Sequence, residues 1–113
     1  MAELNEKAKK VFALKYSMKK TRGWKDACTE MANFIGDGEI PYTKDDEEIK
    51  QIKEKFFQFL FDLIFIPGGR IIANAGTGIK NLANCFVLGI DDSRTSIYKT
   101  LGDAAEVFAM GGG

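Results

Sequence analysis

Histidine is absent from this chain of 113 residues, and cysteine and proline occur only twice each. The absence of histidine removes the usual general base near neutral pH and the commonest metal ligand in proteins. The two cysteines, Cys28 and Cys85, are too few for a disulfide scaffold and too widely separated for a CxxC metal site. We therefore expect no metal site within this sequence.

An excess of charge of one sign is also missing, because sixteen basic residues balance sixteen acidic ones. A neutral chain creates no long-range field that would favour nucleic acid or an anionic membrane as a partner. The N-terminal stretch "MAELNEKAKK" is charged throughout and does not resemble a signal peptide. The most apolar window, "FFQFLFDLIFI", contains Gln58 and Asp62 and is too short to span a bilayer. These patterns predict a cytoplasmic protein without a nucleic-acid or membrane partner.

The composition changes near Ile66. Residues 1–66 carry 24 of the 32 charges and three glycines, whereas residues 67–113 carry eight charges and nine glycines. A charge-rich, glycine-poor segment is typical of helices, and a glycine-rich one is typical of turns and loops. We therefore predict a helical domain over 1–66, and a second unit of strand, loop and helix over 67–113.

Three helices are expected in the first part, because apolar residues there recur at helical spacing. Their apolar faces are Leu4, Ala8, Val11 and Phe12; then Trp24, Ala27, Cys28, Met31 and Ile35; then Ile49, Ile52, Phe56, Leu60 and Leu63. Thr43 is the expected N-cap of the third helix, and Pro67 is expected to close it. Phe57 and Phe61 widen its apolar face and predict a deeply buried C-terminal end.

In the second part, "PGGRIIANAGTG" predicts a turn, a short apolar run and a glycine-rich loop. The following "CFVLGI" has the length and composition of a strand. A last helix should follow, capped by Asp92 or Ser93, with Ile97, Leu101 and Phe108 on its apolar face. The loop "GTGIKN" lacks the features of a nucleotide-binding loop and is interpreted as a turn.

The two cysteines differ in their surroundings. Cys28 lies on the apolar face of a predicted helix, which indicates a thiol packed in the core. Cys85 stands at the start of the predicted strand, where it is either a small buried hydrophobe or a reactive thiol facing a cleft. The residue pattern alone leaves both interpretations of Cys85 open.

Four motifs in a fixed order resemble the large catalytic subunit of ribonucleotide reductase, in particular its adenosylcobalamin-dependent (class II) members. They are "FIPGGRIIANAGT", "NCFVL", "DDSRTSI" and "GGG". The resemblance is strong over 65–113 and weaker over the helices before it. It implies a mostly α chain in which the helical domain precedes the first strand, loop and helix of a ten-stranded α/β barrel.

The resemblance also implies roles for single residues. Cys85 matches the first cysteine of the redox pair that reduces the ribose, and its partner cysteine belongs to a later segment of the family. The residues that match substrate-binding positions are Gly69, Asn84, Cys85 and Gly113. The residues that match the binding site of the allosteric effector are Asp92, Ser93 and Arg94.

Other parts of the family's machinery have no match in this sequence. The radical-forming cysteine, the second redox cysteine and the adenosylcobalamin site lie further along in the family. The resemblance therefore implies an N-terminal fragment that is inactive alone. Its partners would be a ribonucleotide substrate, a deoxynucleoside triphosphate effector, a thioredoxin- or glutaredoxin-type reductant and the rest of the reductase chain. Two alternatives are a non-catalytic helical module that senses nucleotides and a structural domain that docks on a partner.

Overall fold

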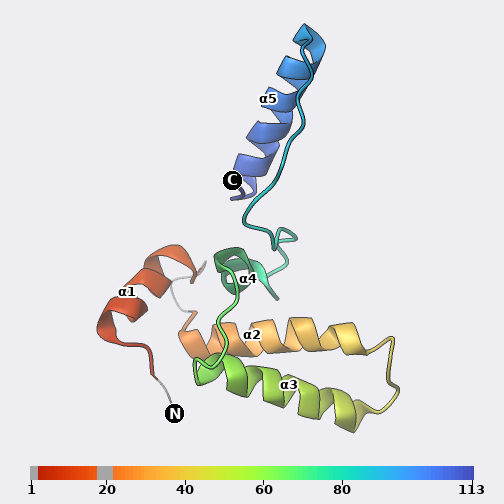
Figure 1. Cartoon of the computed structure of the whole chain (residues 1–113). Coiled ribbons are helices and arrows are strands. Elements are labelled where there is room, and N and C mark those ends of the chain that lie inside the picture. The colour runs from red at the N-terminus through yellow and green to blue at the C-terminus, as the bar shows by residue number, and fades with distance from the viewer. Residues whose placement is uncertain (1–2, 18–21) are drawn as a thin grey trace.

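A computed structural model describes residues 3–17 and 22–113 of the chain, and every regular element within them is helical (Figure 1). The elements are α1 (Glu6–Lys15), α2 (Trp24–Gly36), the 3₁₀ helix η1 (Asp37–Glu39), α3 (Asp46–Phe61), α4 (Gly69–Asn74) and α5 (Arg94–Ala109). The three helices predicted for the first part are confirmed, as is the last helix. The described residues contain no strand, so the predicted first strand of a barrel is not formed in this structure.

Helices α2 and α3 form a long hairpin, with η1 in the turn between them (Figure 1). The α2 helix begins after Gly23, whose N–H donates to the Asp26 carboxylate at 2.9 Å. The α3 helix is capped by Asp45, which accepts the Glu47 N–H at 2.9 Å. The prediction that Thr43 is this N-cap is wrong, because the aspartate lies directly before the first helical residue and bonds the free N–H groups there.

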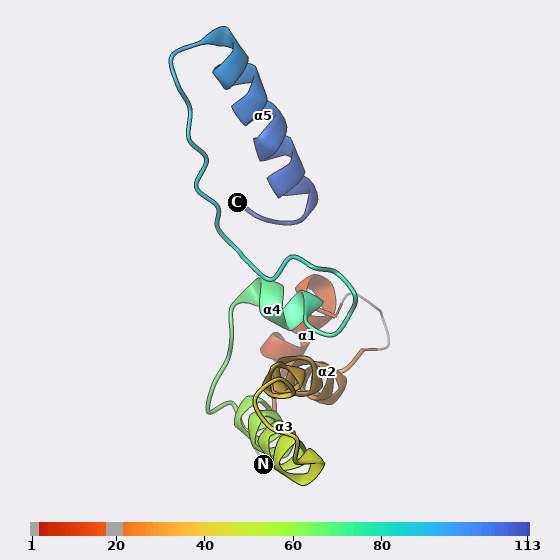
Figure 2. The same ribbon diagram turned by 90° about the vertical axis from the view of Figure 1, so that its right-hand side faces the viewer.

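The core of the helical part lies where α1 and α4 cover one end of this hairpin (Figure 2). Phe12 of α1 meets Trp24 of α2 edge to face, with their ring centroids 5.7 Å apart. The apolar side chains that are buried together are Phe12, Ala27, Cys28, Met31, Ala32, Leu60, Ile72 and Ala75. This cluster joins residues from both sides of Ile66, so α4 packs as part of the helical unit.

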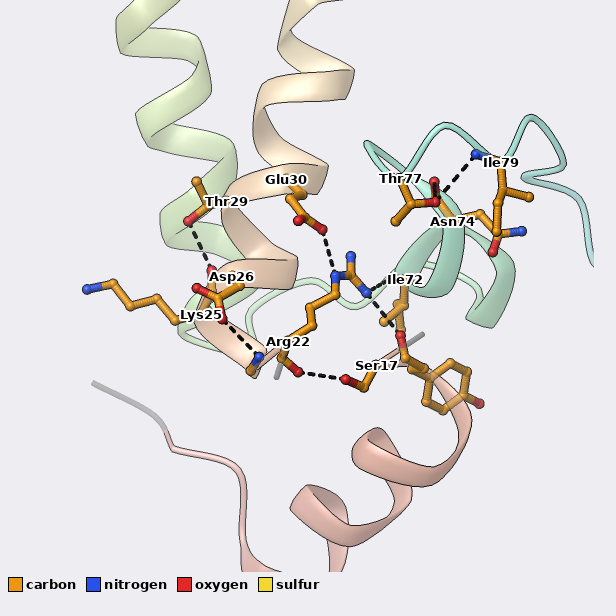
Figure 3. Close-up of polar contacts among 12 residues, drawn as sticks. Ser17, Arg22, Lys25, Asp26, Thr29, Glu30, Ile72, Asn74, Thr77 and Ile79 are labelled. Atoms are coloured by element: carbon orange, nitrogen blue, oxygen red, sulfur yellow. Dashed lines mark hydrogen bonds and ion pairs between the residues drawn. The ribbon is translucent and has the colours of Figure 1, made fainter. Parts of the chain in front are cut away.

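Arg22 joins three helices at this core (Figure 3). Its guanidinium donates to the Glu30 carboxylate of α2 at 2.6 Å, to the Tyr16 carbonyl at 2.9 Å and to the Ile72 carbonyl of α4 at 3.0 Å. The Arg22 side chain is only 4% exposed, and the bonds made by its Nε and Nη1 replace part of the hydration that the charge loses on burial. Arg22 thereby fixes the end of α1 against α4.

The C-terminal end of α3 differs from its prediction. The helix ends at Phe61 rather than near Pro67, and Leu63 adopts a left-handed backbone with φ of 59°. Leu60 is buried, but Phe57 and Phe61, which predicted the deep burial of this end, are only half-buried. The deep burial expected for this end is therefore wrong, because α2 packs along only one face of α3.

The second part contains a helix where a turn and a short apolar run were predicted, because α4 forms over Gly69–Asn74. The predicted strand "CFVLGI" is instead an extended segment without strand assignment, running beside α5 (Figures 1 and 2). A strand needs a neighbouring backbone to complete its hydrogen-bond ladder, and these residues have such a neighbour only at Gly113. Helix α5 and this segment extend away from the helical core (Figure 1).

Candidate functional site

Three segments converge at the C-terminal end, or base, of α5: Gly69–Arg70, Asn84–Phe86 and Gly111–Gly113. The N–H of Arg70 donates to the side-chain oxygen of Asn84 at 3.1 Å. The N–H of Gly113 donates to the backbone carbonyl of Asn84 at 2.9 Å. The structure therefore brings together all four residues predicted to bind substrate: Gly69, Asn84, Cys85 and Gly113.

Two glycines allow these segments to approach so closely. A Cβ atom placed on Gly68 would lie 2.6 Å from the side-chain nitrogen of Asn84. Gly111 has φ of 80°, and a Cβ there would lie 2.4 Å from a guanidinium nitrogen of Arg70. Only glycine accepts both this conformation and this contact without a shift of its neighbours. The glycines of "PGGR" and "GGG" therefore serve the packing of one site.

The hydrogen bonds around Cys85 have the pattern of a parallel β-bridge. Gly113 donates to the carbonyl before Cys85 and accepts, at 2.8 Å, the N–H of Phe86 after it. Parallel pairing requires a long crossover between the two segments, and α5 provides one here. Cys85 is thus held in extended backbone beside Gly113, although no strand is formed.

The two thiols lie in opposite environments. Cys28 is completely buried, and this burial raises the pKa of its thiol to about 12, against a smaller opposing influence of the Arg22 charge. The prediction of a core thiol at Cys28 is confirmed. Cys85 is exposed and free, so its interpretation as a small buried hydrophobe is wrong for this structure. Of the two thiols, only that of Cys85 is accessible from solvent.

Asp92, Ser93 and Arg94, the predicted effector-binding residues, lie apart from this site, at the opposite end of α5 (Figure 2). Ser93 is the N-cap of α5, and its hydroxyl oxygen accepts the Ser96 N–H at 3.2 Å, as predicted. Asp92 and Arg94 are exposed beside it. The structure thus places the two predicted sets at opposite ends of one helix.

Sequence reasoning missed Tyr16, which follows α1 and packs against Gly69. A Cβ atom on Gly69 would lie 2.9 Å from the ring of Tyr16 and 3.4 Å from its hydroxyl oxygen. No local pattern indicates this contact, because it depends on how α1 docks against α4.

Within 3–17 and 22–113, no group of three or more His, Cys, Asp or Glu side chains is placed to hold a metal ion. Among the same residues, no helix combines the length and the apolar character needed to cross a bilayer.

Comparison with known proteins finds sequence similar to part of this chain in one class of enzyme, the ribonucleotide reductases that depend on vitamin B12. The chain is 48% identical over 60 residues to the vitamin B12-dependent ribonucleoside-diphosphate reductases of Mycobacterium tuberculosis strains CDC 1551 / Oshkosh and H37Rv. It is 37% identical over 59 residues to the enzyme of the same name from Thermoplasma acidophilum. The resemblance inferred from the four motifs is thereby confirmed as a partial homology.

The extent of this homology is limited. The aligned region covers 53% of this chain but only 9% of the CDC 1551 / Oshkosh relative. No family model matches the chain, and no solved structure matches it.

Proposed function

We propose that this chain supplies one redox cysteine, part of the substrate pocket and part of the effector site of a ribonucleotide reductase. The observation that supports the proposal best is the convergence of Gly69, Asn84, Cys85 and Gly113 at one place in the fold. These residues come from three separate motifs of the sequence, "PGGR", "NCFVL" and "GGG".

The proposed reaction replaces the 2′-hydroxyl of a ribonucleotide with hydrogen after a radical has formed at C3′. Cys85 and a second cysteine supply two electrons and two protons by closing to a disulfide. The hydroxyl leaves as water, so one ribonucleotide and two thiols give one deoxyribonucleotide, one disulfide and one water. A dithiol reductant of the thioredoxin or glutaredoxin type then reduces the disulfide through thiol–disulfide exchange.

Cys28 does not serve as the second cysteine in this proposal. Its side chain is fully buried between the helices, whereas Cys85 is exposed at the base of α5. A disulfide requires Cα atoms no more than about 7 Å apart, and a core thiol would have to leave its packing to reach another residue. The second cysteine therefore belongs to another part of the reductase.

Adenosylcobalamin, which the relatives' dependence on vitamin B12 implies, would generate the initial radical in such an enzyme. The described residues do not fit this group. Histidine is absent from the chain, the described residues offer no metal-holding cluster, and the exposed thiol of Cys85 has no second ligand grouped with it. We therefore assign no step of the cofactor's chemistry to these residues.

Effector binding is proposed for Asp92, Ser93 and Arg94. The Asp92 carboxylate can accept a hydrogen bond from the 3′-hydroxyl of a deoxyribose, and Arg94 can pair with phosphate. Both side chains are exposed at the start of α5, where they are available to a nucleotide. Their separation from Cys85 is consistent with a regulatory site distinct from the substrate pocket.

A structural docking domain is the second candidate, and the exposed apolar surface near α5 favours it. Val87 is 99% exposed and Leu101 is 64% exposed, which is unusual for apolar side chains of this size. A reductase explains the same observation, because the rest of the enzyme would cover this surface. The two candidates differ at Cys85, for which a docking domain has no use.

The test is a chimera in which this chain replaces the segment of the M. tuberculosis reductase that contains the 60 aligned residues. We expect the chimera to form deoxycytidine diphosphate from cytidine diphosphate with adenosylcobalamin and a dithiol, and the isolated chain to form none. A folded chimera without activity, alongside an active parent enzyme, would contradict the proposed function. Product formation by the isolated chain would contradict the assignment of the radical chemistry to other residues.

A further inference from the structure

The position of Tyr16 is fixed from both sides of its backbone. Its N–H donates to the Phe12 carbonyl at 2.9 Å, which closes the last turn of α1. Its carbonyl accepts a hydrogen bond from Arg22 at 2.9 Å, and the same guanidinium nitrogen bonds the Ile72 carbonyl of α4. Tyr16 is thereby tied to α4, the helix that begins at Gly69.

The phenol of Tyr16 occupies the space that a side chain at position 69 would need. A Cβ on Gly69 would lie 2.9 Å from Cε1 of Tyr16 and 3.4 Å from its hydroxyl oxygen. The distance to Cε1 is shorter than carbon atoms tolerate, so glycine at 69 and tyrosine at 16 fit one another. The Tyr16 hydroxyl is thus presented beside the backbone of Gly69, one of the predicted substrate-binding residues.

The hydrogen-bonding capacity of this hydroxyl is not used within the described residues. Tyr16 is half-buried, and neither 3–17 nor 22–113 provides a hydrogen-bond partner for its phenol group. The next residue after Gly69, Arg70, carries a guanidinium that lies against Gly111, and no carboxylate of the described chain pairs with it. The Tyr16 hydroxyl lies beside Gly69 and the Arg70 guanidinium beside Gly111. Both groups are donors that suit an anionic oxygen, such as that of a phosphate.

We infer that Tyr16 is a substrate-binding residue whose hydroxyl donates a hydrogen bond to a phosphate oxygen of the ribonucleotide at Gly69. This inference rests on the proposed function and adds to it a contact from α1, outside the four motifs. It also means that the helical part of the chain takes a direct part in binding.

The experiment compares the affinities of the 113-residue chain and its variants for cytidine diphosphate and for cytidine by titration calorimetry. Tyr16→Phe removes the hydroxyl and keeps the ring. A hydrogen bond to a charged acceptor corresponds to about 10- to 100-fold in affinity, so the variant should bind cytidine diphosphate more weakly by that factor. Its affinity for cytidine should not change. Tyr42→Phe is the matched control, because Tyr42 is 84% exposed in the turn between α2 and α3.

An exchange of the two residues provides a second test. Gly69→Ser alone should weaken the binding of cytidine diphosphate, because the new side chain displaces the Tyr16 ring. In the double variant Tyr16→Ala with Gly69→Ser, the serine hydroxyl enters the vacated space, and the affinity should recover relative to Tyr16→Ala. Circular dichroism of each variant establishes that the helices are retained.

Three outcomes distinguish the claims. Equal affinity of Tyr16→Phe and the unchanged chain for cytidine diphosphate would overturn the role of Tyr16 and leave the proposed function standing. Equal loss of affinity for cytidine and for cytidine diphosphate would also overturn it, because the contact would not be to phosphate. Failure of the unchanged chain to bind cytidine diphosphate would overturn both the substrate assignment of the proposed function and this inference.

Discussion

The backbone of Gly113 pairs with the residues on both sides of Cys85. Its N–H donates to the Asn84 carbonyl at 2.9 Å, and its carbonyl accepts the Phe86 N–H at 2.8 Å. Two residues that are far apart in the sequence are thereby held side by side in parallel orientation. The exposed thiol of Cys85 therefore stands on a backbone that is fixed on one edge, rather than on a free loop.

This pairing should depend on Gly111, whose φ of 80° turns the chain after α5. Gly111→Ala should strain the backbone by about 1–3 kcal/mol and push against Arg70, so the Gly113 pairing should open. Hydrogen exchange at the Phe86 amide should become faster. Gly102→Ala is the control, because a Cβ there meets open space within α5, and it should stabilise the helix by about 0.5–1 kcal/mol. Unchanged exchange at the Phe86 amide in Gly111→Ala would show that the backbone pairing of Gly113 with Asn84 and Phe86 does not depend on this turn.

The two thiols should differ in reactivity. Iodoacetamide should modify Cys85 in the folded chain, because its exposed thiol is accessible to the reagent. Cys28 should stay unmodified until the chain unfolds, because its pKa is about 12 and its side chain is fully buried. Peptide mass spectrometry of the labelled chain, with and without denaturant, measures both rates. Rapid labelling of Cys28 under native conditions would contradict its place in the core.

The buried thiol should also make stability depend on alkaline pH. The pKa of Cys28 is raised from 9.0 in its ordinary state to about 12 in the folded chain. Below pH 9 the Cys28 thiol is protonated in both the folded and the unfolded chain. Between pH 9 and 12 only the unfolded chain loses this proton, so the free energy of unfolding falls as the pH rises. Within this range the free energy of unfolding should fall by about 1.4 kcal/mol for each pH unit. Urea unfolding of the unchanged chain and of Cys28→Ala at several alkaline pH values isolates this contribution, because the variant should lack that slope.

Much of the helical part could be predicted from the sequence. Apolar spacing located Phe12, Cys28, Met31 and Leu60 on the faces that are buried, since this spacing is set by helix geometry alone. The cap of α3 was misplaced because Thr43 and Asp45 are both good caps, and only the backbone path decides between them.

The second part could be predicted less well. Whether "CFVLGI" becomes a strand depends on a neighbouring backbone, which is a non-local property that its own residues do not carry. The four residues predicted to bind substrate were identified from motifs, whereas the contact of Tyr16 with Gly69 depends on the docking of α1 and has no local signal.

Effector control should depend on Asp92. In the chimera with the M. tuberculosis reductase, Asp92→Ala should weaken the binding of a deoxynucleoside triphosphate effector by about 10-fold or more, since a charged acceptor is lost. Basal turnover should change little, because Asp92 lies at the other end of α5 from Cys85 (Figure 2). Equilibrium binding of the effector, measured beside the unstimulated rate, separates the two effects. Unchanged effector affinity would remove Asp92 from the site.

The central claim is that Cys85 delivers electrons to the substrate, and the steady-state rate of a Cys85→Ser chimera with a chemical dithiol tests it most directly. Serine cannot form the disulfide, so this variant should still bind cytidine diphosphate but should not complete multiple turnovers. Cys28→Ser is the matched control, and it should retain most of the activity with a modest loss of stability from a buried hydroxyl. Normal turnover by Cys85→Ser, or a folded but inactive Cys28→Ser, would contradict the assignment of Cys85 as the redox cysteine.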